Sequence, residues 1–174
     1  MQRRREPETS VAHEVRARGG TPATSFLEKR GIPFRVHTYA FERSAGPIGE
    51  AAARALGVAP ARLLKCLIVR TREGALAAVL LAADKTLDLD AAARVLDTKR
   101  VELAPAAEAE RVTGYVVGGI SPFGQRRRLP ILLDRAALDH PTVFVNGGRR
   151  GLQLELAPAD LLAASEARIA ALAR

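Results

Sequence analysis

The 174 residues suffice for one domain with its own hydrophobic core, and the balance of 48% hydrophobic and 26% charged residues is that of a soluble globular protein. A single cysteine excludes an internal disulfide and a cysteine-rich metal site, and it suits a reducing cytoplasm. No apolar stretch is long enough to span a membrane. The N-terminus lacks the apolar core of a signal peptide. The net charge of +8 favours a polyanionic partner such as nucleic acid, although charge alone is a weak signal.

Residues 1–20 (MQRRREPETSVAHEVRARGG) are charged and lack apolar periodicity, which predicts a disordered basic extension ahead of a domain spanning residues 21–174. A tail of this kind can touch RNA but is more often simply solvated. Thr21 as N-cap and Pro22 at the first helical position predict a helix that stops near Gly31.

The next two predicted elements are a short strand and an amphipathic helix. Residues 34–39 (FRVHTY) alternate as a strand does, which places His37 and Tyr39 on one face. An isolated histidine there is usually structural, and Tyr39 can either pack or line a pocket. Residues 48–57 (IGEAAARALG) predict a helix that ends at its glycine.

The following strand, residues 63–70 (LLKCLIVR), has a buried pattern with one charged intruder, Lys65. By alternation this lysine shares a face with Leu63 and Leu67, so its ammonium must extend to solvent, pair with a carboxylate or face a pocket. From this stretch alone, a solvent-reaching lysine and a functional lysine remain equally open. Cys66 faces the other way, and its buried setting argues against a reactive thiolate.

The middle and the end of the chain predict further strands and helices. We expect a hairpin turn at residues 72–74, followed by a second buried strand at residues 76–83. The patterns then predict helices at residues 87–98, 105–114, 134–140 and 157–174, and strands at residues 101–104, 142–146 and 151–156. In the last of these strands three leucines share one face, and Gln153 and Glu155 share the other.

Residues 113–134 (TGYVVGGISPFGQRRRLPILLD) contain a glycine loop with a basic rim. The apolar run Tyr115–Val117 predicts a strand, Gly118–Pro122 form the loop, and Arg126–Arg128 form the rim before a second strand. Glycines permit a positive φ or a close approach of the backbone to a ligand, so such a loop can direct N–H groups at an anion or a carbonyl oxygen. The alternative is a plain β-turn with a solvated basic edge.

A second glycine loop, residues 146–151 (NGGRRG), follows a strand in the same manner and again carries arginines. The two loops and Lys65 are far apart in sequence, but they can meet if the strands form one curved sheet. The order of elements, with many strands, interspersed helices and several hairpin-length connections, predicts an α/β fold. We expect a single domain with a mixed, largely antiparallel sheet.

Three segments in this order, LLKCLIV around Lys65, TGYVVGGISPFGQRRRLP and FVNGGRRGLQLEL, resemble the bacterial YbaK-type Cys-tRNA(Pro) deacylases. These are freestanding relatives of the editing domain inserted in bacterial prolyl-tRNA synthetases. The resemblance covers residues 21–174. It implies a single α/β domain around a mixed, partly barrel-like sheet, which hydrolyses mischarged Cys-tRNA(Pro) in the cytoplasm without a metal or cofactor.

The resemblance also implies roles for particular residues. Lys65 matches the essential lysine, whose ammonium would hold the terminal nucleotide of the tRNA or the ester region. The residues that would form the substrate pocket are Tyr39, Ile48, Cys66, Gly118, Gly119, Ile120, Ser121, Pro122, Asn146, Gly147 and Gly148. For contact with the RNA we select Arg126, Arg127, Arg128, Arg149 and Arg150. We expect a monomer that selects tRNA(Pro) through a complex with prolyl-tRNA synthetase.

A mechanism without a protein nucleophile agrees with the sequence, which shows no Ser-His-Asp arrangement and no metal-ligand cluster. An aminoacyl ester is already activated, so positioning and electrostatics can supply most of the acceleration. In the family that the chain resembles, the thiol of the substrate is thought to attack its own carbonyl and release a cyclic thiolactone.

Three positions depart from the pattern of that family. Cys66 stands where threonine is expected, Asn146 where serine is common, and Ile48 where an aromatic residue is common. The substrate residue therefore stays open between cysteine and alanine, serine or another small amino acid. Two other functions also stay open: a non-catalytic tRNA-binding adaptor, and a nucleotide- or phosphate-binding protein that uses the same loops.

Overall fold

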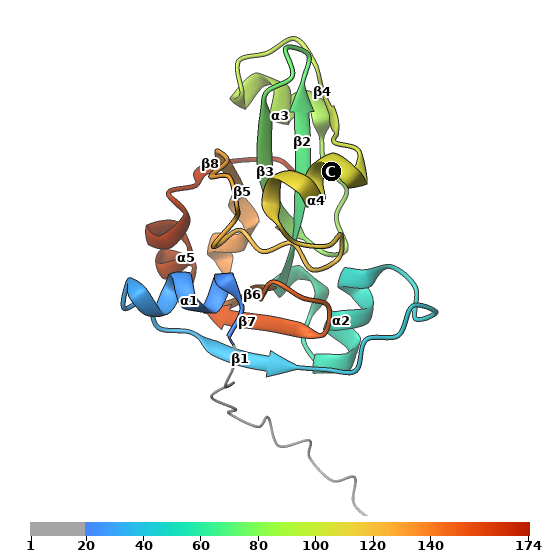
Figure 1. Ribbon diagram of the computed structural model, residues 1–174. Helices are drawn as coiled ribbons and strands as arrows, with labels where there is room; N and C mark the ends of the chain where they lie inside the picture. Colours follow the sequence, from blue (N-terminus) through green and yellow to red (C-terminus); the bar gives the residue numbers. More distant parts are fainter. Residues whose placement is uncertain (1–19) are drawn as a thin grey trace, which may run out of the picture.

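The computed structural model describes residues 20–174 and shows a curved sheet with helices around it (Figure 1). The extension expected at residues 1–20 lies, apart from Gly20, outside the described residues. The helices are α1 (Pro22–Lys29), α2 (Ile48–Leu56), α3 (Leu89–Val95), α4 (Ala106–Thr113) and α5 (Pro158–Ser165), with 3-10 turns at Pro60–Arg62 and Arg135–Asp139. The strands are β1 (Arg35–Thr38), β2 (Leu63–Thr71), β3 (Leu76–Ala82), β4 (Val101–Leu103), β5 (Ile131–Asp134), β6 (Val143–Asn146), β7 (Leu152–Leu156) and β8 (Arg168–Ala170).

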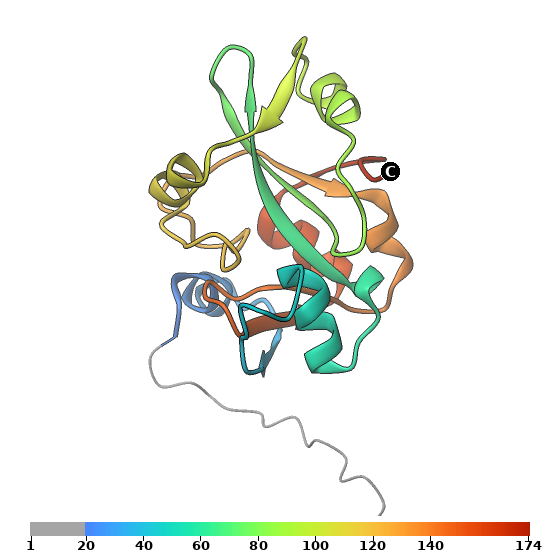
Figure 2. The ribbon, with the colours of Figure 1, turned by 90° about the vertical axis from the view of Figure 1, so that its right-hand side faces the viewer.

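The described strands form one sheet in the order β1-β7-β6-β2-β3-β5-β8, with β4 beside β2. Four of its pairings are antiparallel and three are parallel. The β2–β3 hairpin extends from the top of the molecule down to the level of α2 (Figure 2). One edge of β2 pairs with β6 at its start and with β4 at its end, so this strand joins the two halves of the sheet. The predicted mixed, largely antiparallel fold is confirmed.

The alternation of β2 sends its side chains into separate hydrophobic clusters. Leu64 and Ile68 belong to the largest cluster, which includes buried residues of α1, α4 and α5. Val69 belongs to a second cluster with α3, and Leu63 to a third beneath α2. Helices therefore cover both faces of this strand, which explains its nearly continuous apolar sequence. None of the helices within residues 20–174 has the length and apolar character that crossing a membrane requires.

Local signals read from the sequence set several boundaries correctly. The Thr21 hydroxyl accepts a hydrogen bond from the amide of Thr24 at the start of α1, and Asp88 caps α3 in the same way. Gly57 and Gly114 adopt the left-handed conformation that ends α2 and α4. Residues 72–74 form the predicted hairpin turn between β2 and β3.

The predicted strand at Tyr115–Val117 is wrong, because this run is part of a loop. The Tyr115 hydroxyl donates to the carbonyl of Phe123 at 2.6 Å, and the amide of Gly119 closes a turn on the carbonyl of Val116. The amide of Val117 donates to the carboxylate of Glu110. The groups that the apolar pattern predicted to pair in a sheet therefore form hydrogen bonds within the loop and to α4.

The predicted final helix through residue 174 is also wrong, because α5 ends at Ser165. Glu166 takes a left-handed conformation with a φ of 54°, and β8 then pairs in parallel with β5. The buried carboxylate of Asp134 accepts hydrogen bonds from the amides of Leu172 and Ala173. These contacts hold the end of the chain against the sheet instead of in a helix.

Candidate active site

A cavity of about 380 Å³ lies against the first half of β2, and it is large enough for a small ligand. Its walls come from the start of α2, from β2, from the β4–α4 connection and from the loop after α4, elements that are visible around β2 in Figure 2. The lining residues are Pro47, Ile48, Gly49, Leu63, Leu64, Lys65, Cys66, Leu67, Ile68, Ala83, Leu103, Ala104, Ala106, Ala109, Val117, Gly118, Ile120, Asn146 and Gln153. Most of this surface is apolar, so the few polar groups on it determine where a ligand can form hydrogen bonds or ion pairs.

Lys65 supplies the positive charge of the cavity wall. Its ammonium donates hydrogen bonds to the carbonyl oxygens of Ala83, at 3.3 Å, and of Lys85. No carboxylate within residues 20–174 forms an ion pair with it. Burial lowers the pKa of this ammonium from its ordinary value of 10.5, and the charges of Asp84 and Glu50 offset part of that effect. The lysine is thus partly desolvated and lacks a partner of opposite charge.

Cys66 lies beside Lys65 on the cavity wall but does not offer a nucleophile. Burial raises the pKa of its thiol to about 12, so the thiol stays protonated near neutral pH. The side chain packs against the main hydrophobic cluster, as expected for a small core residue.

The two glycine loops meet at this cavity, as the curved sheet allows. The buried Asn146 side chain joins them, because its amide group donates to the carbonyl of Gly118 at 3.0 Å and its carbonyl accepts from the amide of Gly148 at 2.8 Å. Arg150 adds a second link, since its guanidinium donates two hydrogen bonds to the carbonyl of Val117. Residues from two distant segments therefore fix the shape of the wall.

The first loop needs its two glycines because its backbone lies very close to α2 and to the second loop. Gly118 has a φ of 84°, and a Cβ atom there would lie 2.7 Å from Ile48 Cδ1. A Cβ atom on Gly119 would lie 3.0 Å from the Cα atom of Arg149 in the second loop. The loops can therefore touch each other, and α2, only without side chains at these two positions.

The structure brings together some of the predicted pocket residues and separates others. Five of them line the cavity together with Lys65: Ile48, Cys66, Gly118, Ile120 and Asn146. Gly119, Gly147 and Gly148 are not lining residues and belong to the packed contact between the loops, where the Thr21 hydroxyl donates to the carbonyl of Gly147. Tyr39 packs on the cluster beneath α2, and Ser121 is fully buried.

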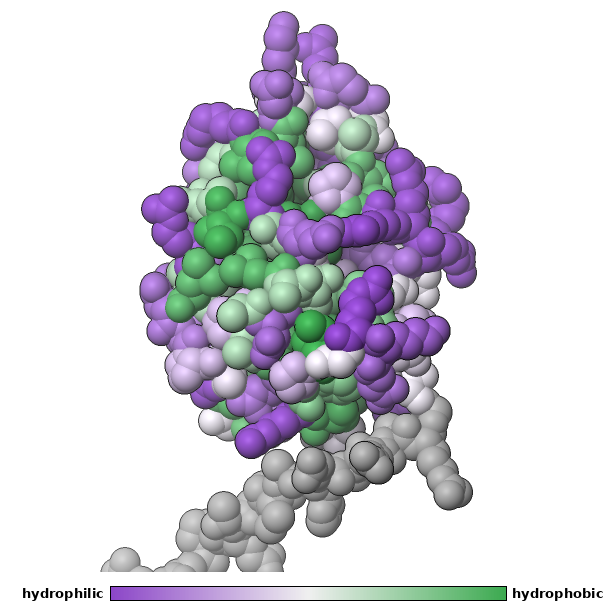
Figure 3. All heavy atoms as spheres, turned by 90° about the vertical axis from the view of Figure 1, so that its left-hand side faces the viewer, coloured by the Kyte–Doolittle hydropathy of each residue, from purple (hydrophilic) through white to green (hydrophobic). Residues whose placement is uncertain are grey.

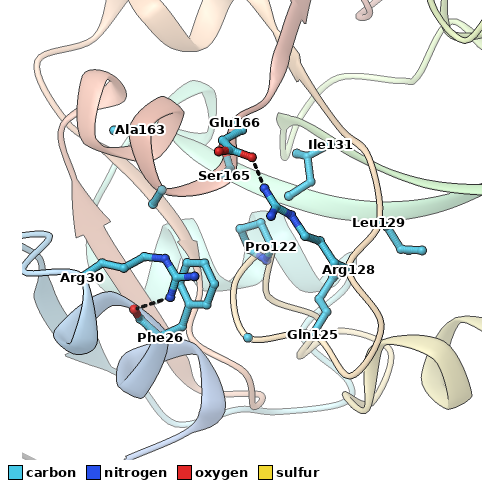
Figure 4. Close-up of a pocket in the computed structure, with 12 residues that line it drawn as sticks. Phe26, Arg30, Pro122, Gln125, Arg128, Leu129, Ile131, Ala163, Ser165 and Glu166 are labelled. Atoms are coloured by element: carbon cyan, nitrogen blue, oxygen red, sulfur yellow. Dashed lines mark hydrogen bonds and ion pairs between the residues drawn. The ribbon is translucent and has the colours of Figure 1, made fainter.

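Pro122 lines a different cavity, of about 180 Å³, between α1, α5 and the loop before β5 (Figure 4). There Arg128 pairs with Glu166, and the guanidinium of Arg30 lies 3.6 Å from the centre of the Phe26 ring. Because these charged groups already have partners within the protein, this second cavity offers less to a ligand than the first.

The arginines predicted to contact RNA differ in how they are held. Arg150 is committed to Val117 and Arg128 to Glu166, while Arg126 donates to the carbonyl of Arg111 at 3.4 Å. Arg127 and Arg149 are exposed, and their side chains form no hydrogen bond or ion pair within the described part of the chain. These two are therefore the more accessible contacts for a phosphate.

Part of the cavity wall is open to solvent. Leu103 and Val117 line the cavity and are 55% and 37% exposed, and Val116 is exposed next to them. On the face at the left of Figure 1, hydrophilic side chains surround and interrupt the hydrophobic areas (Figure 3). The apolar rim formed by Leu103, Val116 and Val117 borders a cavity that contains a lysine. It is therefore a stronger sign of a binding site than the scattered hydrophobic areas on the face in Figure 3.

Sequence analysis missed Gln153 as a site residue, as well as the apolar wall from the β4–α4 connection. The alternation of residues 151–156 placed Gln153 opposite the leucines, which was the available signal. Only the pairing of β7 with β6, which sets Gln153 directly across from Asn146, brings it to the cavity.

Comparison with known proteins identifies relatives of this chain. A family model described as "Aminoacyl-tRNA editing domain" matches residues 45–164. The chain is 30% identical over 151 residues to "Putative Cys-tRNA(Pro)/Cys-tRNA(Cys) deacylase EbsC" of Enterococcus faecalis, which covers 86% of this chain and 91% of that protein. It is 29% identical over 139 residues to "Multifunctional Ser/Thr-tRNA deacylase ProXp-y" of Escherichia coli, covering 79% of this chain and 83% of the relative.

The fold is similar to that of a solved structure described as "Crystal structure of a putative trans-editing enzyme for prolyl tRNA synthetase". The similarity has a TM-score of 0.78 at 27% identity, and it covers 88% of this chain and 95% of the other.

Proposed function

The chain belongs to the aminoacyl-tRNA editing domain family, and from this premise we propose that it is a trans-acting deacylase that hydrolyses Cys-tRNA(Pro) in the cavity beside Lys65. The observation that carries the proposal is the lysine ammonium, which has no carboxylate partner among residues 20–174 and is set in an apolar cavity where two glycine loops meet. The name of the relative with 30% identity supports cysteine as the esterified residue, and it gives both tRNA(Pro) and tRNA(Cys) as the carrier.

Lys65 acts by electrostatics in this account. A partly desolvated ammonium interacts strongly with negative charge, because the effective dielectric constant around it is low. Two of its three N–H groups bond to the carbonyls of Ala83 and Lys85, which leaves one donor for the substrate. That donor would bind the terminal nucleotide or the oxygen of the ester carbonyl, where negative charge develops during cleavage.

The sulfur of the esterified cysteine supplies the nucleophile. It forms a bond to its own carbonyl carbon, the bond from that carbon to the ribose oxygen breaks, and the ribose oxygen takes up the thiol proton. The products are a cyclic thiolactone, which water later opens, and a tRNA with a free terminal hydroxyl. Cys66 cannot replace this thiol, because the raised pKa of about 12 keeps it protonated.

A second specificity is favoured by one specific observation. The relative with 29% identity is named a Ser/Thr-tRNA deacylase, and serine and threonine lack a thiol. With these substrates water must attack the ester directly, at the same carbonyl and with the same lysine. Alanine and other small residues remain further alternatives, because Ile48, Cys66 and Asn146 all line the cavity.

We propose prolyl-tRNA synthetase as the protein partner, with support from a solved structure. A structure with 27% identity is described as a trans-editing enzyme for prolyl tRNA synthetase, which supports a cytoplasmic complex of this chain with that synthetase on tRNA(Pro). The exposed Arg127 and Arg149 would contribute phosphate contacts.

The test is single-turnover hydrolysis of tRNA(Pro) carrying cysteine, serine, threonine, alanine or proline by the wild-type protein. We expect the fastest release of cysteine and no release of proline, which is the correct residue for this tRNA. Release of serine and threonine in place of cysteine would keep the reaction and change the substrate. Binding of tRNA(Pro) without any hydrolysis would support a non-catalytic adaptor, and tight binding of free AMP alone would support a nucleotide-binding protein.

A further inference from the structure

Within residues 20–174 two buried side-chain atoms lack a hydrogen-bond partner, the Tyr39 hydroxyl and Gln153 Oε1, and of these two residues only Gln153 lines the cavity. Glu155, two residues along β7, accepts hydrogen bonds from His37 at 2.8 Å and from Thr142 at 2.6 Å. Asn146, directly across from Gln153 on β6, uses both ends of its side-chain amide in the contact between the glycine loops. The polar side-chain atoms of both neighbours of Gln153 are thus hydrogen-bonded within the protein.

Gln153 differs from these neighbours. It is 3% exposed and lines the cavity, yet its Oε1 atom is buried without a hydrogen-bond partner in the described part of the chain. Its Nε2 atom likewise has no side-chain hydrogen bond within residues 20–174. A buried polar group is expected to be hydrogen-bonded, and one that lacks a protein partner beside a cavity can bond to water or to a ligand there. A half-turn of the amide exchanges its two ends, so the oxygen can face the cavity without repacking.

We propose that the Gln153 carboxamide accepts a hydrogen bond from the side-chain hydroxyl or thiol of the ester-linked amino acid, an inference that rests on the proposed function. An uncharged acceptor suits an uncharged donor. The ammonium of the amino acid would require a carboxylate in such an apolar surrounding, and Lys65 on the same cavity wall would repel it. Gln153 thereby selects substrates with a hydrogen-bonding side chain over substrates of the same size without one.

This form of selection follows from the cost of leaving a buried polar group unpaired. A site built to bond a hydroxyl rejects an analogue that lacks it more strongly than an apolar pocket can. Because a thiol is a weaker donor than a hydroxyl, we expect the part of the preference that Gln153 contributes to be larger for serine over alanine than for cysteine over 2-aminobutyrate. The cysteine preference also contains the loss of the nucleophilic thiol, which does not depend on Gln153.

The test compares these two substrate pairs, carried on tRNA(Pro), with wild type, Gln153→Leu and Gln153→Glu. Leucine is close in volume and removes both polar atoms, whereas glutamate keeps an acceptor oxygen. We expect Gln153→Leu to lower the rate ratio of serine to alanine roughly tenfold, with a smaller drop in the second ratio. Gln153→Glu should keep both preferences. Gln125→Leu, at the other cavity, makes the same substitution away from the proposed site and should leave both ratios unchanged, although it removes a hydrogen bond from Gln125 to the carbonyl of Ser121.

Thermal unfolding separates this role from a structural one. Replacing an unpaired buried amide by leucine should leave the melting temperature equal or higher, since no hydrogen bond is lost. Equal losses of rate on both members of each pair, or a lowered melting temperature with unchanged ratios, would overturn the inference. Wild type that hydrolyses none of the four substrates would instead defeat the proposed function itself.

Discussion

Each half of β2 carries one cationic side chain. One of them is paired with carboxylates and, among the described residues, the other is not. Near the end of the strand, Arg70 pairs with Glu102 at 2.5 Å and with Glu108 at 3.2 Å, and the hydrogen bond to Glu102 above all raises its pKa. Near the start, Lys65 bonds only to backbone carbonyls, and burial lowers its pKa. The same strand thus holds one neutralised cation and one available cation.

This difference indicates which of the two charged residues on the strand is the better candidate for a functional role. Arg70 and its two carboxylates form a surface cluster that satisfies its donors and leaves little for a ligand. Lys65 keeps one N–H free in a cavity whose other walls are mostly apolar. A perturbed lysine without a structural counter-ion is a candidate for chemistry because the fold has not neutralised it.

Replacing each cation by methionine should show the largest contrast. We expect Lys65→Met to slow single-turnover deacylation roughly 100- to 1,000-fold, the range seen when one charge-stabilising donor is lost. Arg70→Met should stay within roughly twofold of wild type, because its ion pairs are partly exposed and neither Arg70 nor its two carboxylates line the cavity. Rates measured on the same misacylated tRNA decide between the outcomes, and comparable losses in both variants would break the contrast.

Gly118, in the loop after α4, and Gly74, in the turn between β2 and β3, form a matched pair with nearly equal φ, 84° and 87°. Alanine is strained at both positions, at about 1 kcal/mol or more of unfolding free energy. Only at Gly118 does the new Cβ atom meet Ile48 and Arg150, whereas nothing lies within 4 Å at Gly74. We therefore expect Gly118→Ala alone to lower the deacylation rate, roughly tenfold or more, through displacement of the cavity wall.

Urea unfolding and single-turnover kinetics on both variants measure the two effects separately. If Gly74→Ala lowers the rate as much as Gly118→Ala, backbone strain rather than the contact between the loops controls activity.

Charge reversal at the exposed arginines should have a smaller effect, confined to binding. Arg149→Glu and Arg127→Glu should each weaken tRNA binding and lower the slope of log K against log salt by about one or less. Arg128→Glu should change the slope less, since Arg128 already pairs with Glu166. Filter binding over a range of salt concentrations gives the slopes, and unchanged slopes for Arg127 and Arg149 would remove them from the RNA surface.

The smallest expected effect is the pH dependence of stability that Lys65 contributes. The folded protein binds the Lys65 proton more weakly than the unfolded chain does, because burial lowers the pKa from 10.5. Between the lowered pKa and 10.5, the unfolded state therefore holds more protons, and stability should rise with pH. Urea unfolding of wild type and Lys65→Met across this window should show the rise in wild type only. A parallel curve for Lys65→Met would assign it to other groups.

The sequence supported the prediction of β2, its charged intruder and the meeting of the two loops, because these depend on local patterns and on glycine. Lys65 is conspicuous within an apolar strand, and paired glycines indicate close approach. The cavity position of Asn146 agreed with the expected pocket, although its role in joining the loops depends on Gly118 and Gly148.

What the sequence could not show depends on contacts that an apolar or helical pattern does not encode. The Tyr115–Val117 run has strand-like composition, but its partners are Phe123 and Glu110 rather than a strand. The end of the chain has helical composition, yet Asp134 and β5 bind it as an extended segment. Gln153 became a candidate only when its lack of a partner was visible. In each case tertiary contacts outweighed local propensity.

The most direct test of the central claim is to remove the Lys65 ammonium and then restore it. Lys65→Cys alkylated with bromoethylamine carries a lysine-like side chain with an ammonium, whereas iodoacetamide gives a neutral side chain of similar length. Cys66 should not react under mild conditions, because its pKa of about 12 keeps it protonated, and alkylated wild type provides the check.

Single-turnover hydrolysis of Cys-tRNA(Pro) is then measured for each form. The account predicts that Lys65→Cys is nearly inactive, that the aminoethylated form recovers most of the rate, and that the neutral form does not. Full activity of Lys65→Cys, or equal recovery by both alkylated forms, would contradict the claim that the reaction depends on this ammonium.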